Sequence, residues 1–396
     1  MYSHLDFVKE RDDYLLSRAW EIRECPKCSK SYFAKKDFDN CGSYECSGGY
    51  NFLDIPAPRD FLTLQPCQEN FLSHFEKSGY NIAIPLGIVR TNERTLFVSA
   101  AGQVFDDLIY GKTDKPTEEI CFVIQPVIRL QGKGLVGEVE GFSTAFLNAA
   151  TEQWNTDAKQ HFTALDYWLD FFSSQEFYVG NLCLRYSSSE NDWNGKNIFS
   201  EMLKINYGGL EIGIANYFSG IELNNNQFAT MSDISIGLER FLWARNKTAS
   251  YFDAIGPLTY AITKDIILID TLRTLTLMSG AGVIPGHKNH GYKFRLLANK
   301  IANPFHKIPI SELVEFYYKQ WSDFIKPTRS LQSAIGFVRR EIDRSINLHL
   351  NKLLKIDEDY RQSQEDFLIS LLKDKIIDLA QLRCLLGDKN HGQQER

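Results

Sequence analysis

Four cysteines fall in one short block near the start of the chain. Cys25 and Cys28 form C-P-K-C, and Cys41 and Cys46 follow in C-G-S-Y-E-C. Two close thiolate pairs are a common ligand set for a tetrahedral Zn2+. Because four thiolates leave no open coordination position, we expect a structural zinc ribbon. The alternative is four reduced thiols, but so short and polar a segment has little apolar material with which to hold itself together.

A second group of charged residues lies in apolar segments that also contain glycines. Arg129 ends the run I-Q-P-V-I-R, and Glu211 lies within G-G-L-E-I-G-I. Asp233 and Arg240 belong to S-D-I-S-I-G-L-E-R-F-L-W-A. A guanidinium can bind a phosphate through two parallel hydrogen bonds, and a strand carboxylate can hold a Mg2+ that bridges phosphates. Taken singly, each residue fits a surface ion pair at least as well, so only their combination indicates a nucleotide site.

A sheet with flanking helices is needed to position these residues. Apolar residues at helical spacing predict helices over residues 62–78 and 161–174. Between and after them lie runs of strand character, among them N-I-A-I-P-L-G-I-V-R, T-L-F-V-S-A-A and F-A-T-M-S-D-I-S-I. After residue 260 the pattern is almost wholly helical. The sequence therefore predicts an α+β fold, in which a mainly antiparallel sheet with flanking helices precedes an all-helical domain.

The composition is that of a globular chain without a membrane span. Of its 396 residues, 43% are hydrophobic and 24% are charged, and this length is enough for roughly two or three domains. No apolar run approaches the roughly 20 residues that a membrane helix needs, and the acidic N-terminus is no secretory signal. We therefore expect a cytoplasmic protein with reduced thiols. The scattered cysteines, expected in the core, are Cys67, Cys121, Cys183 and Cys384.

The formal net charge of −6 offers no overall attraction for nucleic acid, so any RNA-binding surface must be a local patch. One basic cluster lies in the C-terminal helical region and could meet an RNA backbone. The alternative is a solvated helix face, because Glu341 and Asp343 lie within the same stretch. The basic cluster consists of Lys326, Arg329, Arg339, Arg340 and Arg344.

Taken in order, these stretches resemble the class II aminoacyl-tRNA synthetases, and specifically the alanyl-tRNA synthetase family in its archaeal form. I-Q-P-V-I-R is similar to the strand that opens motif 2, and S-D-I-S-I-G-L-E-R-F-L-W-A is similar to motif 3. D-T-L-R-T-L-T-L-M-S-G-A-G resembles the start of the helical domain that meets the tRNA acceptor stem. The resemblance implies a zinc-ribbon segment over residues 1–58, a class II catalytic domain over 59–262 and the helical domain over 263–396.

The resemblance also implies which residues hold ATP and Mg2+. Arg129 would bind the α-phosphate and stabilise the charge that builds up as the amino-acid carboxylate attacks it. Arg240 would lie near the adenine and the γ-phosphate, and these two arginines would be the catalytic residues. Glu211 would help to hold Mg2+ or ATP, Phe146 would stack on adenine, and Gly237 would contact ATP. In-line displacement at phosphorus needs positioning and charge neutralisation more than a general base.

For the amino acid, the resemblance implies a small pocket. Asp233 would bind the ammonium group, Trp193 would form a wall beside the side chain, and Gly209 would contribute backbone. Such a pocket suits a small amino acid, with alanine as the favoured candidate. Serine and glycine would be poorly excluded, because one methyl or hydroxyl group is worth only about 1–3 kcal/mol. Glu239 is expected to orient neighbouring groups rather than to contact substrate.

The sequence departs from the family pattern within motif 2. Gly141 and Phe142 stand where the family carries an Arg-His pair, and Leu147 stands where a glutamate is expected to read the adenine amino group. Glu138 and Glu140 add negative charge where pyrophosphate would lie, at an electrostatic cost if they point inward.

Three functions are compatible with these features. The first is a short alanine–tRNA ligase without the editing and C-terminal domains, with ATP, a small amino acid and the tRNA acceptor stem as its partners. The second is a paralogue that passes the activated amino acid to a carrier protein or a natural-product acceptor. The third is a non-catalytic module that binds tRNA or nucleotide. The retained charges favour a ligase that forms an aminoacyl-adenylate, because an inactive site has no need of four charged groups in a partly buried pocket.

Overall fold

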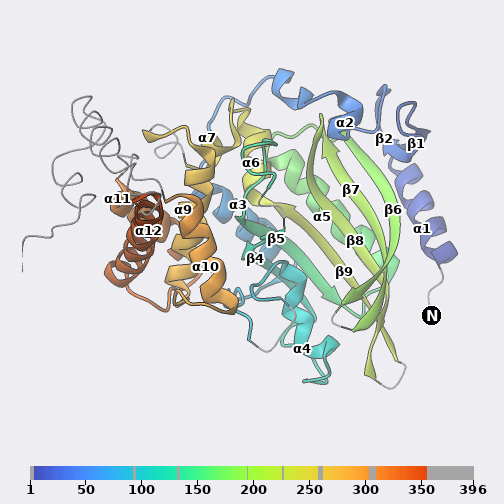
Figure 1. Cartoon of the computed structure of the whole chain (residues 1–396). Coiled ribbons are helices and arrows are strands. Elements are labelled where there is room, and N and C mark those ends of the chain that lie inside the picture. Colours follow the sequence, from blue (N-terminus) through green and yellow to red (C-terminus); the bar gives the residue numbers. More distant parts are fainter. Residues whose placement is uncertain are drawn as a thin grey trace, which may run out of the picture. The chain divides into compact units, whose positions relative to one another are not determined.

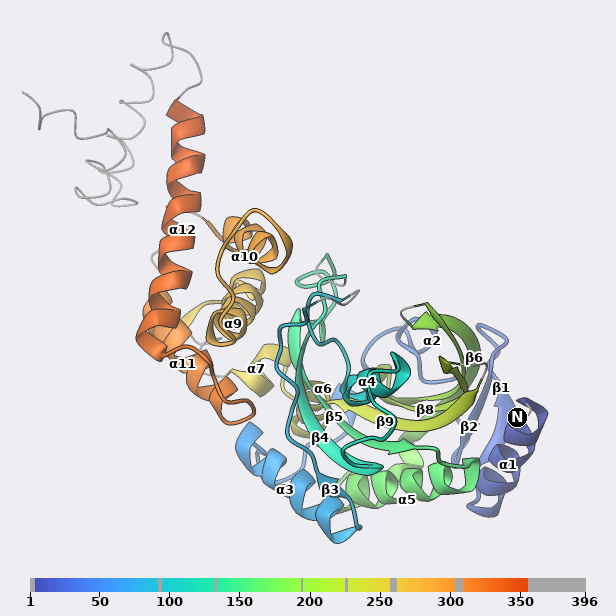
Figure 2. The ribbon, with the colours of Figure 1, turned by 90° about the horizontal axis from the view of Figure 1, so that it is seen from below.

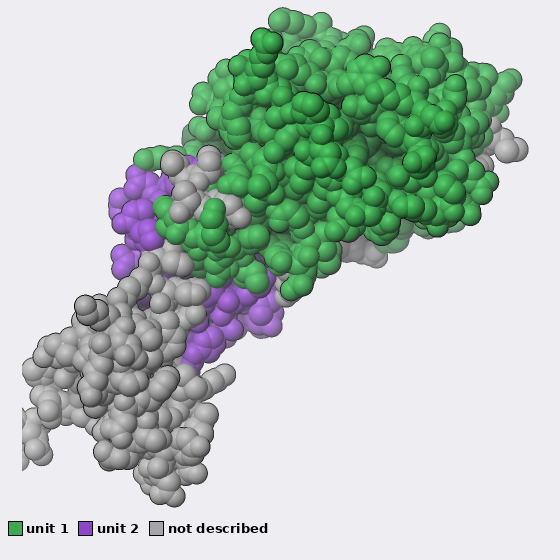
Figure 3. Space-filling model, turned by 90° about the horizontal axis from the view of Figure 1, so that it is seen from above, with its two compact units in different colours: residues 1–270, 319–326 green, residues 271–318, 327–396 purple. Residues whose placement is uncertain are grey.

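The computed structural model describes residues 4–91, 95–131, 134–193, 195–224, 227–256, 262–302 and 309–354 (Figure 1). The chain divides into two compact units, which Figure 3 distinguishes by colour. Unit 1 comprises Met1–Asp270 with Lys319–Lys326, and unit 2 comprises Thr271–Tyr318 with Pro327–Arg396.

A nine-stranded sheet lies at the centre of unit 1, in the order β1-β2-β6-β7-β8-β9-β5-β4-β3. Every neighbouring pair is antiparallel except β3 and β4, which are parallel. The predicted α+β class with a mainly antiparallel sheet is therefore confirmed. The strands are β1 (Glu21–Glu24), β2 (Ser31–Ala34), β3 (Asn81–Ile82), β4 (Ile120–Ile128), β5 (Ala145–Trp154), β6 (Leu182–Trp193), β7 (Lys196–Tyr207), β8 (Leu210–Glu222) and β9 (Phe228–Gly237).

Helices flank this sheet within unit 1. They are α1 (His4–Ser17), α2 (Tyr44–Ser47), α3 (Leu64–Lys77), α4 (Asp106–Ile109), α5 (Ala158–Ser174), α6 (Leu238–Asn246) and α7 (Tyr251–Ile255), with the short 3-10 helices η1 (Asn51–Asp54), η2 (Ala101–Phe105) and η3 (Val179–Asn181). The helices predicted over 62–78 and 161–174 correspond to α3 and α5. The division between the units falls inside α9 (Ile266–Gly280), and unit 2 also contains α10 (Asn289–Lys300), most of α11 (Ile310–Ser322) and α12 (Leu331–Leu354).

Two predicted strands are wrong in extent. The run N-I-A-I-P-L-G-I-V-R forms only the two-residue β3, because Pro85 has no N–H to donate and interrupts the pairing. The run T-L-F-V-S-A-A is not a named strand. It makes the single bridge between Val89 and Phe97 and then turns into η2.

The two faces of the sheet carry different layers (Figure 2). Helices α3 and α5 cover the convex face with aromatic side chains. Phe71 of α3 contacts Phe171 of α5 at 3.9 Å between ring centroids, and it also packs against Phe122 of β4. On the concave face, η2 lies over β5, where the Ala101 N–H donates to Asn148 Oδ1 at 2.9 Å. Side chains that point to the concave face are therefore those available to a ligand.

Helix α6 follows β9 without a loop and is fixed to β5. Gly237 is its N-cap, and the following residues L-E-R-F-L-W-A supply good helix formers and an apolar surface. The fully buried Glu239 accepts from the Leu147 N–H through both carboxylate oxygens, at 3.0 and 2.9 Å. This contact agrees with the expected orienting role of Glu239. Lys247, in the left-handed region at φ 54°, ends the helix.

The aromatic layer between α3 and the sheet should contribute a large part of the stability of unit 1. We expect Phe71→Ala to lower the free energy of unfolding by about 3–5 kcal/mol, because it leaves a cavity that the neighbouring aromatic rings cannot fill completely. Urea denaturation measures the change. Phe61→Ala is the matched control, since Phe61 is 51% exposed and its removal should cost within about 0.5 kcal/mol. Equal losses for the two variants would show that this layer is not the stabilising core.

Candidate functional site

A cavity of about 250 Å³ opens on the concave side of the sheet in unit 1. That volume is near the lower end of the roughly 300–1,000 Å³ typical of small-molecule sites. Strands β5, β8 and β9, helix α6 and the segment after β4 contribute its walls. The lining residues are Arg129, Gln131, Gly141, Phe142, Ser143, Phe146, Asn148, Glu211, Ile212, Gly213, Ile214, Ser235, Ile236, Gly237, Glu239, Arg240 and Tyr251.

This cavity brings together all five residues that the sequence assigned to ATP and Mg2+. Arg129 lies just after β4, and its Nε donates to the Ser99 carbonyl at 2.7 Å. Its guanidinium lies 5.0 Å from the centre of the Phe146 ring, within the range of a cation–π contact. Glu211 of β8, Gly237 of β9 and Arg240 of α6 line the same cavity. Residues more than a hundred positions apart in the sequence thus share one cavity.

Arg240 is held in place by backbone carbonyls. Its Nε donates to the Gly141 carbonyl at 2.9 Å and its Nη1 to the Glu211 carbonyl at 3.1 Å, while the guanidinium lies 5.0 Å from the Phe142 ring centre. The Glu211 carboxylate forms an ion pair with Lys204 at 3.0 Å, and both side chains are partly exposed. A metal or nucleotide at Glu211 would therefore compete with Lys204.

The departures in motif 2 have different structural consequences. Gly141 adopts φ 81°, and a Cβ there would lie 2.8 Å from the Trp243 ring, so a bulkier residue does not fit this backbone. The Glu140 carboxylate accepts from the Ser250 hydroxyl and the Tyr251 N–H at the start of α7, at 2.6 and 2.7 Å. Its charge therefore stabilises a helix N-terminus. Leu147 is fully buried and is not one of the cavity residues.

Asp233 lies outside the cavity lining but on a strand that contributes to it. Ser235, two residues further along β9, lines the cavity. Burial raises the pKa of Asp233 to about 6, although a hydrogen bond from Ser235 and the charge of Arg129 act in the opposite direction. Asp233 pairs across the sheet with Glu152 of β5 on one side and with Asn216 of β8 on the other. These three side chains form one row on the concave face.

The other two residues assigned to the amino acid lie elsewhere in unit 1. Trp193, at the end of β6, packs beside an apolar cluster that contains Met231 and Phe218. Its Nε1 donates to Asp106 Oδ1 at 3.0 Å. Gly209 forms the turn between β7 and β8 at φ 93°, and a Cβ there would lie 1.9 Å from the Gly49 carbonyl oxygen. That close approach accounts for a glycine at position 209, which is not one of the cavity residues.

Glu152 is the main residue that sequence reasoning missed. It belongs to A-F-L-N-A-A-T-E-Q-W, where strand alternation places it on the same face as Phe146 and Asn148. The signal that could have identified Glu152 is the presence of a charged residue in an otherwise mostly apolar strand. Its partner across the sheet depends on the β5–β9 register, which the sequence does not reveal.

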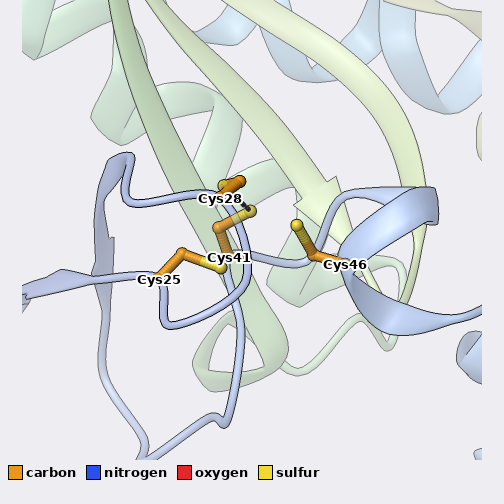
Figure 4. A group of neighbouring side chains, drawn as sticks. All are labelled: Cys25, Cys28, Cys41 and Cys46. Carbon is orange, nitrogen blue, oxygen red and sulfur yellow. Dashed lines mark hydrogen bonds between the residues drawn. The ribbon is translucent and has the colours of Figure 1, made fainter.

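The four N-terminal cysteines converge as predicted (Figure 4). Their sulfur atoms all lie within 4.8 Å of one another, and the four thiols could hold a metal ion. Gly42 makes the turn beside Cys41 at φ 73°. Burial raises the pKa of the Cys25 thiol, but N–H donors from Lys27, Cys28 and Cys41 outweigh this and lower the pKa to about 6. Such donors favour a thiolate, the form that binds metal. Of the scattered cysteines, Cys67, Cys121 and Cys183 are buried, and Cys384 lies outside the described residues.

Two arginines of the basic cluster in the C-terminal region have hydrogen-bond partners within unit 2. The Arg329 guanidinium donates to the carbonyls of Ser279, Gly282 and Val283 at the end of α9, each at 3.0 Å. Arg344 Nε donates to the buried Glu341 at 2.6 Å. Cations at a helix C-terminus stabilise the helix. At least these two arginines therefore have structural partners.

Comparisons with known proteins point to one kind of enzyme. The chain is similar to alanine–tRNA ligases. It is 26% identical over 284 residues to that of Sulfurisphaera tokodaii, covering 67% of this chain and 31% of the relative. It is 24% identical over 408 residues to that of Thermococcus kodakarensis, covering 80% of this chain and 43% of the relative. The relative from Korarchaeum cryptofilum gives 24% over 384 residues, with 78% and 42% covered.

This similarity is partial. The chain spans less than half of the length of these curated relatives, and no family model matches it. Among the described residues, no helix has the length and apolar character that crossing a membrane requires.

The cysteine cluster should bind zinc with a defined stoichiometry. We expect about one equivalent of Zn2+ per chain by elemental analysis, because four converging thiolates complete a tetrahedral site. Cys46→Ser should lose most of this zinc. Cys67→Ser is the control, since Cys67 is a buried thiol that is not part of the cluster. A folded wild-type protein that binds no zinc would contradict the assignment.

Proposed function

We propose that this chain is a ligase that activates a small amino acid with ATP as an aminoacyl-adenylate and transfers it to tRNA. The observation that carries the proposal is the single cavity lined by Arg129, Phe146, Glu211, Gly237 and Arg240. The similarity to alanine–tRNA ligases supports it and makes alanine the first amino acid to test.

The proposed chemistry is an in-line displacement. The amino-acid carboxylate attacks the α-phosphorus of ATP, and pyrophosphate leaves. Arg129 would neutralise the charge that develops on the α-phosphate, and Arg240 would bind the nucleotide from the α6 side. Glu211 would hold Mg2+ once the ion displaces Lys204, with which its carboxylate pairs at 3.0 Å. No general base is required, since positioning and electrostatics account for most of the catalysis in phosphoryl transfer.

The remaining parts take supporting roles in this proposal. The nine-stranded sheet would be a class II synthetase sheet within a catalytic domain of residues 59–262. The four-cysteine segment in residues 1–58 would be a structural zinc ribbon, and the helices of residues 263–396 would meet the tRNA acceptor stem. Asp233 would bind the ammonium group of the amino acid, and Trp193 would limit the size of its side chain.

Amino-acid-dependent exchange of pyrophosphate into ATP tests the central step. We expect exchange with alanine in the wild-type protein and a loss of at least about a hundredfold in Arg129→Ala, because one positioned charge on the transition state is worth roughly 10²–10³ in rate. Arg59→Ala is the control, since Arg59 is an exposed residue outside the cavity. Full exchange in Arg129→Ala would refute the role of Arg129.

Transfer is tested separately by adding bulk tRNA and labelled amino acid. Labelled tRNA would establish the ligase activity. Exchange without tRNA labelling would mean another acceptor, such as a carrier protein. Absence of exchange with every amino acid would refute the proposed activation.

The ionisation of Asp233 predicts a pH dependence of amino-acid binding. Asp233 has its pKa raised to about 6, and only its ionised form pairs with an ammonium group. Affinity for alanine should therefore be constant above that pH and fall about tenfold per unit below it. Calorimetric titration with alanine from about pH 5 to pH 8 measures this. Asp233→Asn should bind weakly and without this dependence, whereas an unchanged profile in Asp233→Asn would exclude Asp233 as its source.

A further inference from the structure

Two carboxylates lie side by side beneath η2. Glu152 of β5 is directly opposite Asp233 of β9, and opposite residues of antiparallel strands have Cβ atoms about 4.5–5.5 Å apart. Glu152 is fully buried. Among the described residues, neither of its oxygens has a hydrogen-bond partner, and the same holds for Asp233 Oδ1 and Asn216 Oδ1. Within the described part of the chain, one cross-strand row thus holds four buried acceptor atoms that lack a donor.

This arrangement is costly unless a ligand completes it. Unpartnered buried acceptors are rare in native proteins, and a bound ligand or ion is a common reason for those that occur. One ammonium group offers three N–H donors and a single charge. It can satisfy Asp233 and Asn216, but it leaves most of the Glu152 carboxyl unpaired. A second ammonium group would supply the missing donors and the missing charge.

The 3-10 helix η2 lies close above the pair. Gly102 of η2 lies over both carboxylates, and a Cβ built on it would be 3.5 Å from Asp233 Oδ2 and 3.6 Å from Glu152 Oε2. The same Cβ would lie 2.9 Å from the Met231 methyl group, so a glycine at position 102 is what lets η2 lie this close to the two acids. The Asp233 side chain is only partly buried, and Ser235 connects its position to the cavity.

The charges of the neighbouring groups agree with a dicationic ligand. Arg129 is near enough to affect Asp233 electrostatically, so its charge belongs to the balance of this site before ATP binds. One arginine, two carboxylates and an amino acid with two ammonium groups and one carboxylate sum to zero. With alanine, the same site carries one uncompensated negative charge unless the Glu152 carboxyl keeps a proton. Burial and the charge of Asp233 raise the pKa of Glu152 well above its usual value, and a second ammonium group beside Glu152 would act in the opposite direction by favouring the ionised carboxylate.

We propose that Glu152 and Asp233 form a two-carboxylate subsite for the two ammonium groups of a short diamino acid, such as 2,3-diaminopropionate or 2,4-diaminobutyrate. This inference rests on the proposed amino-acid site and names its substrate class. Glu152 is then the residue that determines specificity.

Calorimetric titration of the zinc-loaded full chain, without ATP, tests the subsite. The probes are 2,4-diaminobutyrate, alanine and 2-aminobutyrate, the last of which has the same carbon chain without the second charge. We expect the diamino acid to bind at least about tenfold more tightly than either monoamino acid, which corresponds to one additional charge-assisted hydrogen bond. Equal or weaker binding of the diamino acid would overturn the proposal.

Glu152→Gln is the decisive variant, because it keeps the size of the side chain and removes its charge. It should abolish the preference for the diamino acid over 2-aminobutyrate. Glu201→Gln is the control, since Glu201 is also a buried strand carboxylate, and it accepts from the Tyr186 hydroxyl. A preference that survives in Glu152→Gln would overturn the role of Glu152, even if the wild-type protein selects the diamino acid.

Three further outcomes separate the diamino-acid subsite from a metal-ion site, from an unselective amino-acid site and from the proposed activation. The proposal fails if the pair is a metal-ion site. In that case, Mg2+ or Ca2+ alone would bind the wild-type protein and displace the diamino acid, and neither ion would bind the Glu152→Gln variant. If pyrophosphate exchange occurs with alanine but binding shows no selectivity, the proposed function stands and the subsite does not. Selective binding without any exchange would support the subsite and refute the proposed activation.

Discussion

The register between β5 and β9 is the constraint on which the candidate site depends. Asn148 pairs with Gly237 and Glu152 with Asp233, which places the cavity wall and the acid pair on one concave face. A slip of one residue would turn every side chain of a strand to the opposite face. The buried Glu239 helps to fix this register, because it joins the first turn of α6 to the Leu147 N–H of β5. The aromatic layer of α3 and α5 covers the other face and makes a slip costly.

On the concave face of the sheet, the requirements of ligand binding conflict with those of stability. On the convex side of the sheet, His161 Nδ1 of α5 hydrogen-bonds the Ser232 hydroxyl at 2.7 Å, and the Trp168 indole donates to Thr151 at 2.9 Å, which leaves His161 Nε2 without a partner among the described residues. On the concave side, by contrast, Glu152 and Asp233 retain buried oxygens without donors among the described residues. A chain selected only for stability would gain by replacing Glu152 with an apolar residue of similar volume. The presence of two such acids opposite one another is therefore better explained by a ligand than by packing.

Much of the fold could be predicted from the sequence, and the reasons differ by element. The α3 and α5 helices have strong apolar periodicity, and the close spacing of the cysteines within each pair indicated that the four thiols would converge. The five cavity residues could be named because motif resemblance carries information about contacts that local patterns do not contain. The extent of β3 was wrong, since Pro85 limits pairing in a run whose apolar character alone indicated a strand. Glu152 was missed because its meaning comes from Asp233, a distant residue that meets it only through a strand pairing that no local pattern encodes.

The motif 2 departures acquire a physical explanation once the backbone is known. Gly141 takes a left-handed conformation against Trp243, so the Arg-His pair of the resembled family could not be accommodated there without moving α6. The Glu140 carboxylate accepts hydrogen bonds from Ser250 and Tyr251 at the start of α7. Glu140 is therefore directed towards α7 and is not one of the cavity residues. In this chain the loop contributes contacts that brace α7. In the proposed ATP site, Arg129 and Arg240 would neutralise the triphosphate without cationic side chains at positions 141 and 142, so the charge balance at the amino-acid end would matter more. This greater importance of the charge balance agrees with the proposal that Glu152 of β5 and Asp233 of β9 determine specificity.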